Sequence, residues 1–134
     1  MTHIFKTRVY YEDTDSGGIV YYANYLKFIE RARTELIYNL GFSLEELSEK
    51  YDNHFVVKNI NCNFLYSAKL EDILSIKSQL LILKKTYFEL DQSIYRFDNK
   101  IFQAKVCIVC INNSNKPTKI CEKLRVKIES EFKF

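Results

Sequence analysis

The sequence predicts an α+β fold in which an antiparallel sheet wraps around a long central helix. Two observations predict it: a stretch of helical period follows one N-terminal strand, and four long strand-like segments then follow one another without helices between them. A parallel nucleotide-binding sheet is excluded, because the chain has neither alternating strand–helix units nor a Gly-rich phosphate loop. The length of 134 residues suits one domain, which we expect to span residues 1–134.

The first two expected elements are a strand and a long helix. Residues 3–10, HIFKTRVY, carry the β-branched and aromatic side chains that favour a strand. From about residue 22 to residue 40 apolar side chains recur at helical spacing, and Gly41 stands where a helix C-terminal glycine belongs. The chain is therefore expected to form its longest helix soon after its first strand.

The apolar residues of this helix cover a wide arc. Leu26 and Ile37 form a second apolar row, whereas Arg31 and Glu35 have the i,i+4 spacing of an ion pair on the wetter side. We therefore expect the helix to be largely enclosed, with that ion pair facing solvent.

Shorter elements complete the layout. Ser43 and Glu46 have the spacing of a capping box, which predicts a short second helix. The pair Asp98–Asn99 is typical of a tight hairpin turn, and the tail predicts a closing helix over about residues 121–131. Four long strands are expected between the second helix and the tail, at about residues 56–66, 71–85, 86–97 and 100–112.

Composition and charge narrow the class of partner. Hydrophobic residues make up 47% and charged residues 28%, as in folded proteins rather than disordered or fibrous chains. The net charge is only +3, and 20 basic residues are scattered among 17 acidic ones, so we expect no nucleic-acid partner. No segment approaches the ~20 apolar residues that span a bilayer, and MTHIFKTRVYYED lacks the apolar stretch of a signal peptide. We therefore expect a cytoplasmic protein without an integral membrane segment.

The four cysteines fit a reducing compartment, because they lack the dense framework of a small secreted domain. Cys107 and Cys110 form a CxxC motif inside KVCIVCI, a strand-like run in which residues three apart point to opposite faces. We interpret them as core thiols rather than as a metal or redox pair.

The stretch YEDTDSGGIVYYANY, residues 11–25, holds three carboxylates and two of the chain's three glycines. Counted from Asp13, it matches a calcium-binding loop at positions one, three and six. The match fails at position five, which is Gly17, and at position twelve, which is Asn24 instead of the bidentate Glu. We therefore expect no metal here.

Two interpretations of this loop remain open. In the first it is a polar turn, with Asp15 or Ser16 capping the helix and the glycines supplying positive φ. In the second, N–H groups of the first helical turn face open space beside an ionised carboxylate, an arrangement that can polarise and attack a carbonyl. A carboxylate is a weak nucleophile, so the substrate would be an activated acyl group such as a thioester. His3 and His54 offer no other catalytic set, because neither lies in a Ser or Cys nucleophile motif.

The segment VYYEDTDSGGIVYYANYLKFIERARTE, residues 9–35, resembles the hotdog-fold acyl-CoA thioesterases of the 4-hydroxybenzoyl-CoA thioesterase type. Within that family it most resembles the YbgC-like branch, which is linked to the Tol–Pal cell-envelope system. FLYSAKLEDIL resembles the family's segment before the long strands, and NKPTKICEKL resembles its closing loop and C-terminal helix. The resemblance implies a hotdog fold and hydrolysis of acyl-CoA thioesters, and we expect no cofactor.

The resemblance also implies which residues form the site. The family's catalytic carboxylate, a nucleophile or general base, corresponds to Asp15, and the backbone N–H that polarises the thioester carbonyl corresponds to that of Tyr22. Tyr11 corresponds to a tyrosine that shapes the site, and Glu30 to an acidic position on the central helix. The YbgC-like branch usually has His where this chain has Tyr22, whereas the hydroxybenzoyl-CoA branch also has Tyr. Because a backbone N–H does not depend on the side chain, we expect this difference to alter rate or acyl preference rather than abolish activity.

Partners are implied in the same way. Proteins of this family join their sheets edge to edge as homodimers, and commonly form homotetramers, with the active site at the dimer interface. Lys58, Lys116 and Lys119 are candidates to meet the phosphates of coenzyme A. An association with the Tol–Pal system is a further implication. Two alternatives remain: a thioesterase that acts on acyl carrier protein, which the mildly basic charge would suit, and a non-catalytic acyl-CoA-binding subunit, for which Tyr22 is the only hint.

Overall fold

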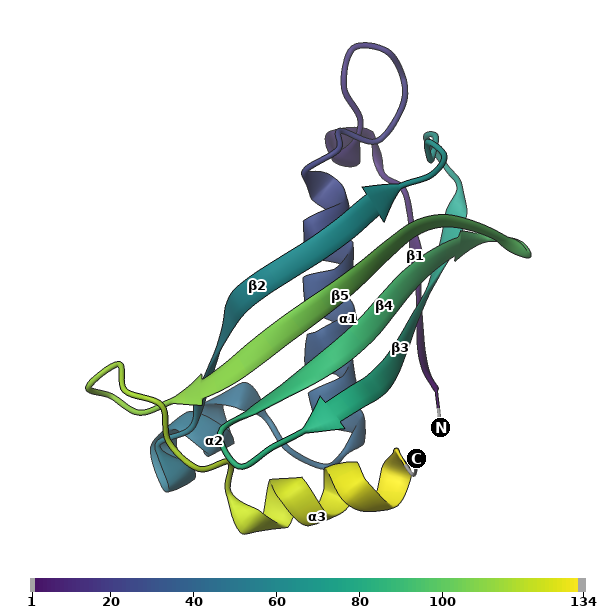
Figure 1. The fold of residues 1–134 in the computed structure, drawn as a ribbon. Coiled ribbons are helices and arrows are strands. Elements are labelled where there is room, and N and C mark those ends of the chain that lie inside the picture. Colours follow the sequence, from purple (N-terminus) through teal and green to yellow (C-terminus); the bar gives the residue numbers. More distant parts are fainter. Residues whose placement is uncertain (1, 133–134) are drawn as a thin grey trace.

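The computed structural model describes residues 2–132 and has the predicted α+β layout. In chain order its elements are β1 (His3–Arg8), the 3-10 turn η1 (Tyr11–Asp13), α1 (Asn24–Asn39), α2 (Leu44–Tyr51), β2 (His54–Phe64), β3 (Ile73–Leu83), β4 (Tyr87–Arg96), β5 (Asn99–Ile111) and α3 (Glu122–Glu131). The five strands form one antiparallel sheet in the order β1-β3-β4-β5-β2. Helix α1 lies across one face of this sheet, and α2 and α3 lie near the end at which α1 finishes (Figure 1).

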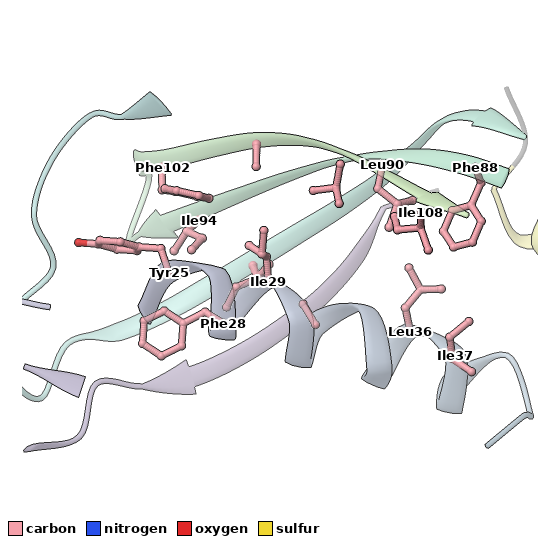
Figure 2. Close-up of a cluster of buried hydrophobic side chains, with 14 of the residues drawn as sticks. Tyr25, Phe28, Ile29, Leu36, Ile37, Phe88, Leu90, Ile94, Phe102 and Ile108 are labelled. Carbon is pink, nitrogen blue, oxygen red and sulfur yellow. The ribbon is translucent and has the colours of Figure 1, made fainter. Parts of the chain in front are cut away.

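The core lies between α1 and the sheet. The apolar residues of α1 repeat at helical spacing, and the sheet offers them an apolar face of alternate residues on each strand. Figure 2 labels the main contacts: Tyr25, Phe28, Ile29, Leu36 and Ile37 from α1, and Phe88, Leu90, Ile94, Phe102 and Ile108 from β4 and β5. Burying one large apolar side chain stabilises a fold by about 1.5–3 kcal/mol, so this interface is the main source of stability.

The expectation that α1 is largely enclosed is wrong for a single chain. Leu26, from the second apolar row, is 38% exposed, although Ile37 from the same row is buried. The sheet covers only one side of α1 and leaves the other side to solvent. The ion pairs among the described residues do not include the expected one of Arg31 with Glu35. Arg31 is exposed, whereas Glu35 is partly buried.

The expected hairpin turn at Asp98–Asn99 is shifted by one residue. Arg96 pairs with Asn99, so the turn consists of Phe97 and Asp98. The register has a one-residue irregularity just before the turn, which lets both strands keep their apolar residues on the core side. In this register Phe97 has a left-handed backbone conformation, at φ 55°, and its side chain is 89% exposed.

The smaller elements agree with expectation. Gly41 has φ +92°, which a helix C-terminal glycine adopts without strain. The Ser43 hydroxyl accepts a hydrogen bond from the Glu46 N–H at 3.0 Å and caps α2. Helix α3 begins one residue after the predicted start and buries Leu124 and Ile128.

The CxxC cysteines point to opposite faces of β5, as predicted. Cys110 is fully buried, whereas Cys107 is partly exposed on the outer face, so the interpretation as a core thiol is right for Cys110 and wrong for Cys107. Burial raises the pKa of the Cys110 thiol to about 11, so this thiol stays protonated at neutral pH. Within residues 2–132, no helix combines the length and the apolar character needed to span a bilayer.

Candidate active site

Asp13 has a structural role at the start of the glycine loop. Its carboxylate is buried and accepts a hydrogen bond from the Tyr10 N–H at 2.8 Å. Its carbonyl accepts hydrogen bonds from the Tyr21 N–H at 3.0 Å and from the Asn24 side-chain amide at 2.9 Å. Asp13 therefore ties the strand that precedes the loop to the helix that follows it.

Asp15 is the exposed carboxylate of the loop, and the backbone around it is tightly closed. Its N–H donates to the Ile19 carbonyl at 2.9 Å, and its carbonyl accepts from the Gly18 N–H at 3.1 Å. One carboxylate oxygen, Oδ1, accepts from the Gly17 N–H at 2.8 Å, whereas Oδ2 has no hydrogen-bond donor among the described residues. The loop thus orients the carboxylate and leaves one oxygen free.

The structure explains why the loop has glycine at both positions 17 and 18. Gly18 has φ +78°, a conformation that residues with a side chain rarely adopt. Gly17 allows close approach, because a Cβ there would lie 3.3 Å from Oδ1 of Asp15. The interpretation of the loop as a polar turn is therefore right in one part and wrong in another. A glycine does supply positive φ, but neither Asp15 nor Ser16 caps α1, whose N-cap residue Ala23 makes no side-chain capping hydrogen bond.

Tyr22 lies two residues before the first residue of α1 and does not itself belong to the helix. Its backbone N–H donates to no described residue, while the N–H of Tyr21 is used by Asp13. The Tyr22 side chain is 62% exposed and meets Phe64 of β2 edge to face, with ring centroids 6.0 Å apart. An open N–H group therefore stands just before the positive end of the helix dipole.

Asp15 and Tyr22 line one common cavity of about 300 Å³. The other wall is the connection between β2 and β3, which approaches α1 only in the folded chain. The complete lining is Asp15, Ile19, Val20, Tyr22, Tyr25, Phe64, Leu65, Tyr66 and Ser67. Asp15 has one free carboxylate oxygen and Tyr22 a free backbone N–H, and both residues line this aromatic-walled cavity. These are the two kinds of group that polarise and attack an acyl carbonyl.

The two walls of this cavity are joined through the buried residue Ala68. The Val20 N–H donates to the Ala68 carbonyl at 2.9 Å, and the Ala68 N–H donates to the Tyr25 hydroxyl at 3.0 Å. Arg96 holds the same connection from the sheet side, with its guanidinium 3.0 Å from Asp72 and 2.9 Å from the Ser67 carbonyl. The cavity is therefore bounded by hydrogen-bonded backbone on both sides.

The remaining predicted residues do not line this cavity. Tyr11 is 81% exposed on η1, and Glu30 borders a separate hollow of about 130 Å³ between α1 and β2. Lys58 lines a broad hollow of about 770 Å³ formed with β4 and β5. Lys116 and Lys119 lie on the connection from β5 to α3, at the end of the sheet away from the loop of Asp15. Of the predicted site residues, a single chain brings only Asp15 and Tyr22 to this cavity.

Sequence reasoning missed the wall opposite Asp15. Phe64 ends β2, Tyr66 and Ser67 follow it, and no motif marks them as site residues. Tyr25 belongs to the side chains that recur at helical spacing, and its ring is buried. The sequence signal that could have marked Tyr25 is its hydroxyl group at a position otherwise occupied by apolar residues.

Among the described residues no three His, Cys, Asp or Glu side chains gather as a metal site would require.

Comparison with known proteins places these features in context. The profile of the thioesterase superfamily matches residues 17–102. The acyl-CoA thioesterase YbgC of Haemophilus influenzae is 39% identical over 108 residues, which cover 81% of this chain and 79% of that protein. The acyl-CoA thioesterase YbgC of Helicobacter pylori is 38% identical over 118 residues, covering 81% and 86%. The crystal structure of a probable thioesterase from Bartonella henselae has a TM-score of 0.87 at 35% identity, over 90% of this chain and 100% of that one.

Proposed function

The chain belongs to the thioesterase superfamily and has its hotdog fold, and on that premise we propose that it hydrolyses acyl-CoA thioesters, with Asp15 as the catalytic carboxylate. The single observation that carries this proposal is the cavity lined by both Asp15, whose carboxylate has a free oxygen, and Tyr22, whose backbone N–H is unpaired. The products are a carboxylic acid and free coenzyme A.

The reaction is a displacement at the thioester carbonyl carbon. The free Oδ2 of Asp15 either attacks this carbon or removes a proton from the water that does so. In both cases the carbonyl oxygen gains negative charge, which the Tyr22 N–H stabilises by a hydrogen bond. The bond from carbon to sulfur then breaks, and coenzyme A leaves as a thiolate that is protonated to the thiol. Water supplies the oxygen of the acid; in the direct route it does so by hydrolysing an acyl–Asp15 anhydride.

The Tyr22 side chain is compatible with this role. The phenol is exposed and packs against Phe64, so it does not cover the backbone N–H with a hydrogen bond of its own. A tyrosine in place of the branch's histidine therefore leaves the proposed donor in place.

The assembly we propose is a homodimer joined at β2, which pairs to a homotetramer. Strand β2 ends the sheet opposite β1, and its outer edge has no partner strand among the described residues. Val56, Val57 and Phe64 of this strand are exposed, as is Leu65 directly after it. An unpaired apolar edge of this kind favours association with a second strand. Glu30 borders the hollow next to β2, so a partner at this edge would lie close to it.

Thiol release from acyl-CoA thioesters of different acyl groups tests the function. We expect hydrolysis by the wild-type protein and a loss of about 10²–10⁴-fold in Asp15→Asn, the range typical of a removed acid–base group. Glu12→Gln is the matched control, because Glu12 is an exposed carboxylate in the preceding turn and its side chain accepts no hydrogen bond from the described residues. Equal rates for Asp15→Asn and the wild type would overturn the assignment. The same acyl groups on acyl carrier protein, measured in parallel, separate that alternative substrate by kcat/KM.

A further inference from the structure

The Tyr25 hydroxyl is a buried polar group with one hydrogen bond accounted for. Tyr25 is 4% exposed, and its oxygen accepts the hydrogen bond from the Ala68 N–H at 3.0 Å. A phenolic hydroxyl both accepts and donates. Because Ala68 acts as the donor in this pair, the proton of Tyr25 must find a different acceptor.

No described residue supplies that acceptor. The hydrogen bonds around it join backbone groups or involve the side chains of Asp13, Asp15 and Arg96, and none of them takes the Tyr25 proton. Figure 2 shows the Tyr25 hydroxyl pointing away from the apolar cluster in which its ring lies. A buried donor without an acceptor is costly, and its presence favours a ligand atom as the partner.

The surroundings of this hydroxyl identify the ligand. Tyr25 lines the same cavity as Asp15 and Tyr22. Resting on the proposed hydrolysis of thioesters, we propose that the Tyr25 hydroxyl is a further catalytic residue, which donates a hydrogen bond to the thioester carbonyl oxygen alongside the Tyr22 N–H. This role is separate from the structural contact that the same oxygen makes with Ala68.

The position of the donor is fixed before substrate arrives. The Tyr25 ring stacks on Phe102 with centroids 5.3 Å apart and planes at 9°. Phe28 and Phe64 meet the same ring edge to face, at 6.2 Å and 5.8 Å. The Ala68 bond then fixes the oxygen, so the hydroxyl needs little reorganisation when charge develops. Such preorganised donors give the largest electrostatic contribution to catalysis.

The protonation state suits a donor. Burial raises the pKa of the Tyr25 phenol, and the hydrogen bond from Ala68 opposes this effect only in part. The phenol therefore keeps its proton at neutral pH. As the carbonyl oxygen gains negative charge, the Tyr25 hydroxyl stabilises it by a hydrogen bond and transfers no proton. When the bond from carbon to sulfur breaks, the carbonyl double bond re-forms and the negative charge leaves with the thiolate.

Tyr25→Phe tests the proposal because it removes only the hydroxyl and keeps the stacked ring. We expect kcat to fall about 10-fold or more, as for the loss of one oxyanion donor, with KM changed less than about threefold. Tyr38→Phe is the matched control, since Tyr38 is an exposed tyrosine on the same helix and lines none of the cavities described above. A wild-type kcat for Tyr25→Phe, or a rise in KM alone, would overturn the proposal and leave Tyr25 as a structural contact.

A fluorinated tyrosine at position 25 keeps the proposal testable if the phenylalanine variant does not fold. Fluorine lowers the phenol pKa and leaves an oxygen for Ala68. Because a donor works only while protonated, the alkaline decline of kcat should move to lower pH in this protein. An unmoved decline would overturn the proposal. Failure here differs from failure of the proposed function, for which the wild-type protein would release no thiol or Asp15→Asn would be fully active.

Discussion

At the scale of single residues, the loop before α1 divides its carboxylates by environment. Asp13 is buried: its carboxylate accepts from Tyr10, and its carbonyl accepts from Tyr21 and Asn24. Asp15 is exposed and keeps one oxygen free. The difference arises from the backbone, because the closed turn over residues 15–19 turns the second carboxylate outward. Charge alone would not have distinguished the two.

The two glycines of this loop make a residue-scale prediction. Gly18→Ala should cost about 1 kcal/mol, because a side chain disfavours its φ of +78° although a Cβ would meet no atom within 4 Å. Gly17→Ala should cost less stability, since Gly17 does not have positive φ, but should reduce kcat more, because its Cβ would crowd Oδ1 of Asp15 at 3.3 Å. Thermal unfolding and thiol release measure both effects. The reverse order of activities would show that loop conformation, rather than crowding of Asp15, controls the site.

At the scale of elements, the register of the strands determines the position of the hairpin turn, even though the turn residues are unfavourable for it. The hairpin between β4 and β5 brings Phe97 into a left-handed conformation that bulky residues disfavour. The adjacent strands compensate, because their inner faces bury Ile94, Ile101 and Phe102 completely. The turn is therefore a consequence of core packing rather than its cause.

This hairpin predicts a stabilising substitution. Phe97→Asn should increase the free energy of unfolding by about 0.5–1 kcal/mol, because asparagine tolerates the left-handed region and the phenyl ring buries little. Urea unfolding measures the difference. Phe97→Val is the informative control, since a β-branched residue should be less stable than phenylalanine at this φ. A destabilised Phe97→Asn would mean that the exposed ring contributes contacts, for example to another subunit.

At the scale of the whole molecule, one chain leaves several apolar surfaces to solvent. The outward side of α1 exposes Leu26, and the free edge of the sheet exposes Val56 and Val57. Lys116 and Lys119, two of the lysines that would meet coenzyme A, lie at the opposite end of the sheet from Asp15, and Lys58 lines a different hollow. Both features fit the proposed dimer, in which a neighbouring chain covers the edge and brings residues to the cavity.

The proposed dimer predicts an asymmetric response of the two sheet edges. Val57→Lys on β2 should give a monomer with reduced thioesterase activity, because a lysine at a paired edge opposes association. Ile4→Lys on β1, where Ile4 is also exposed, should leave the assembly and the activity unchanged. Sedimentation equilibrium measures both proteins. A monomeric wild type, or a Val57→Lys protein that associates as the wild type does, would contradict the β2 interface.

The sequence by itself determined the order and type of the elements, because hydrophobic period, capping residues and glycine positions act over a few neighbouring residues. It also carried the family resemblance that identified Asp15 and Tyr22, since both lie in one continuous motif. The fold and the thioesterase superfamily are confirmed, while the roles of these two residues remain proposals.

Only the tertiary structure decided what lies opposite that motif. Tyr25 and Ala68 are 43 residues apart in the chain, and the packing of α1 on the sheet brings the Tyr25 hydroxyl oxygen to 3.0 Å from the Ala68 backbone nitrogen. The same packing turns the Tyr25 ring into the core and its hydroxyl out of it, a distinction that helical spacing does not contain. Local patterns specify which residues are apolar, whereas long-range packing specifies where the polar atom of a buried side chain lies and what it meets.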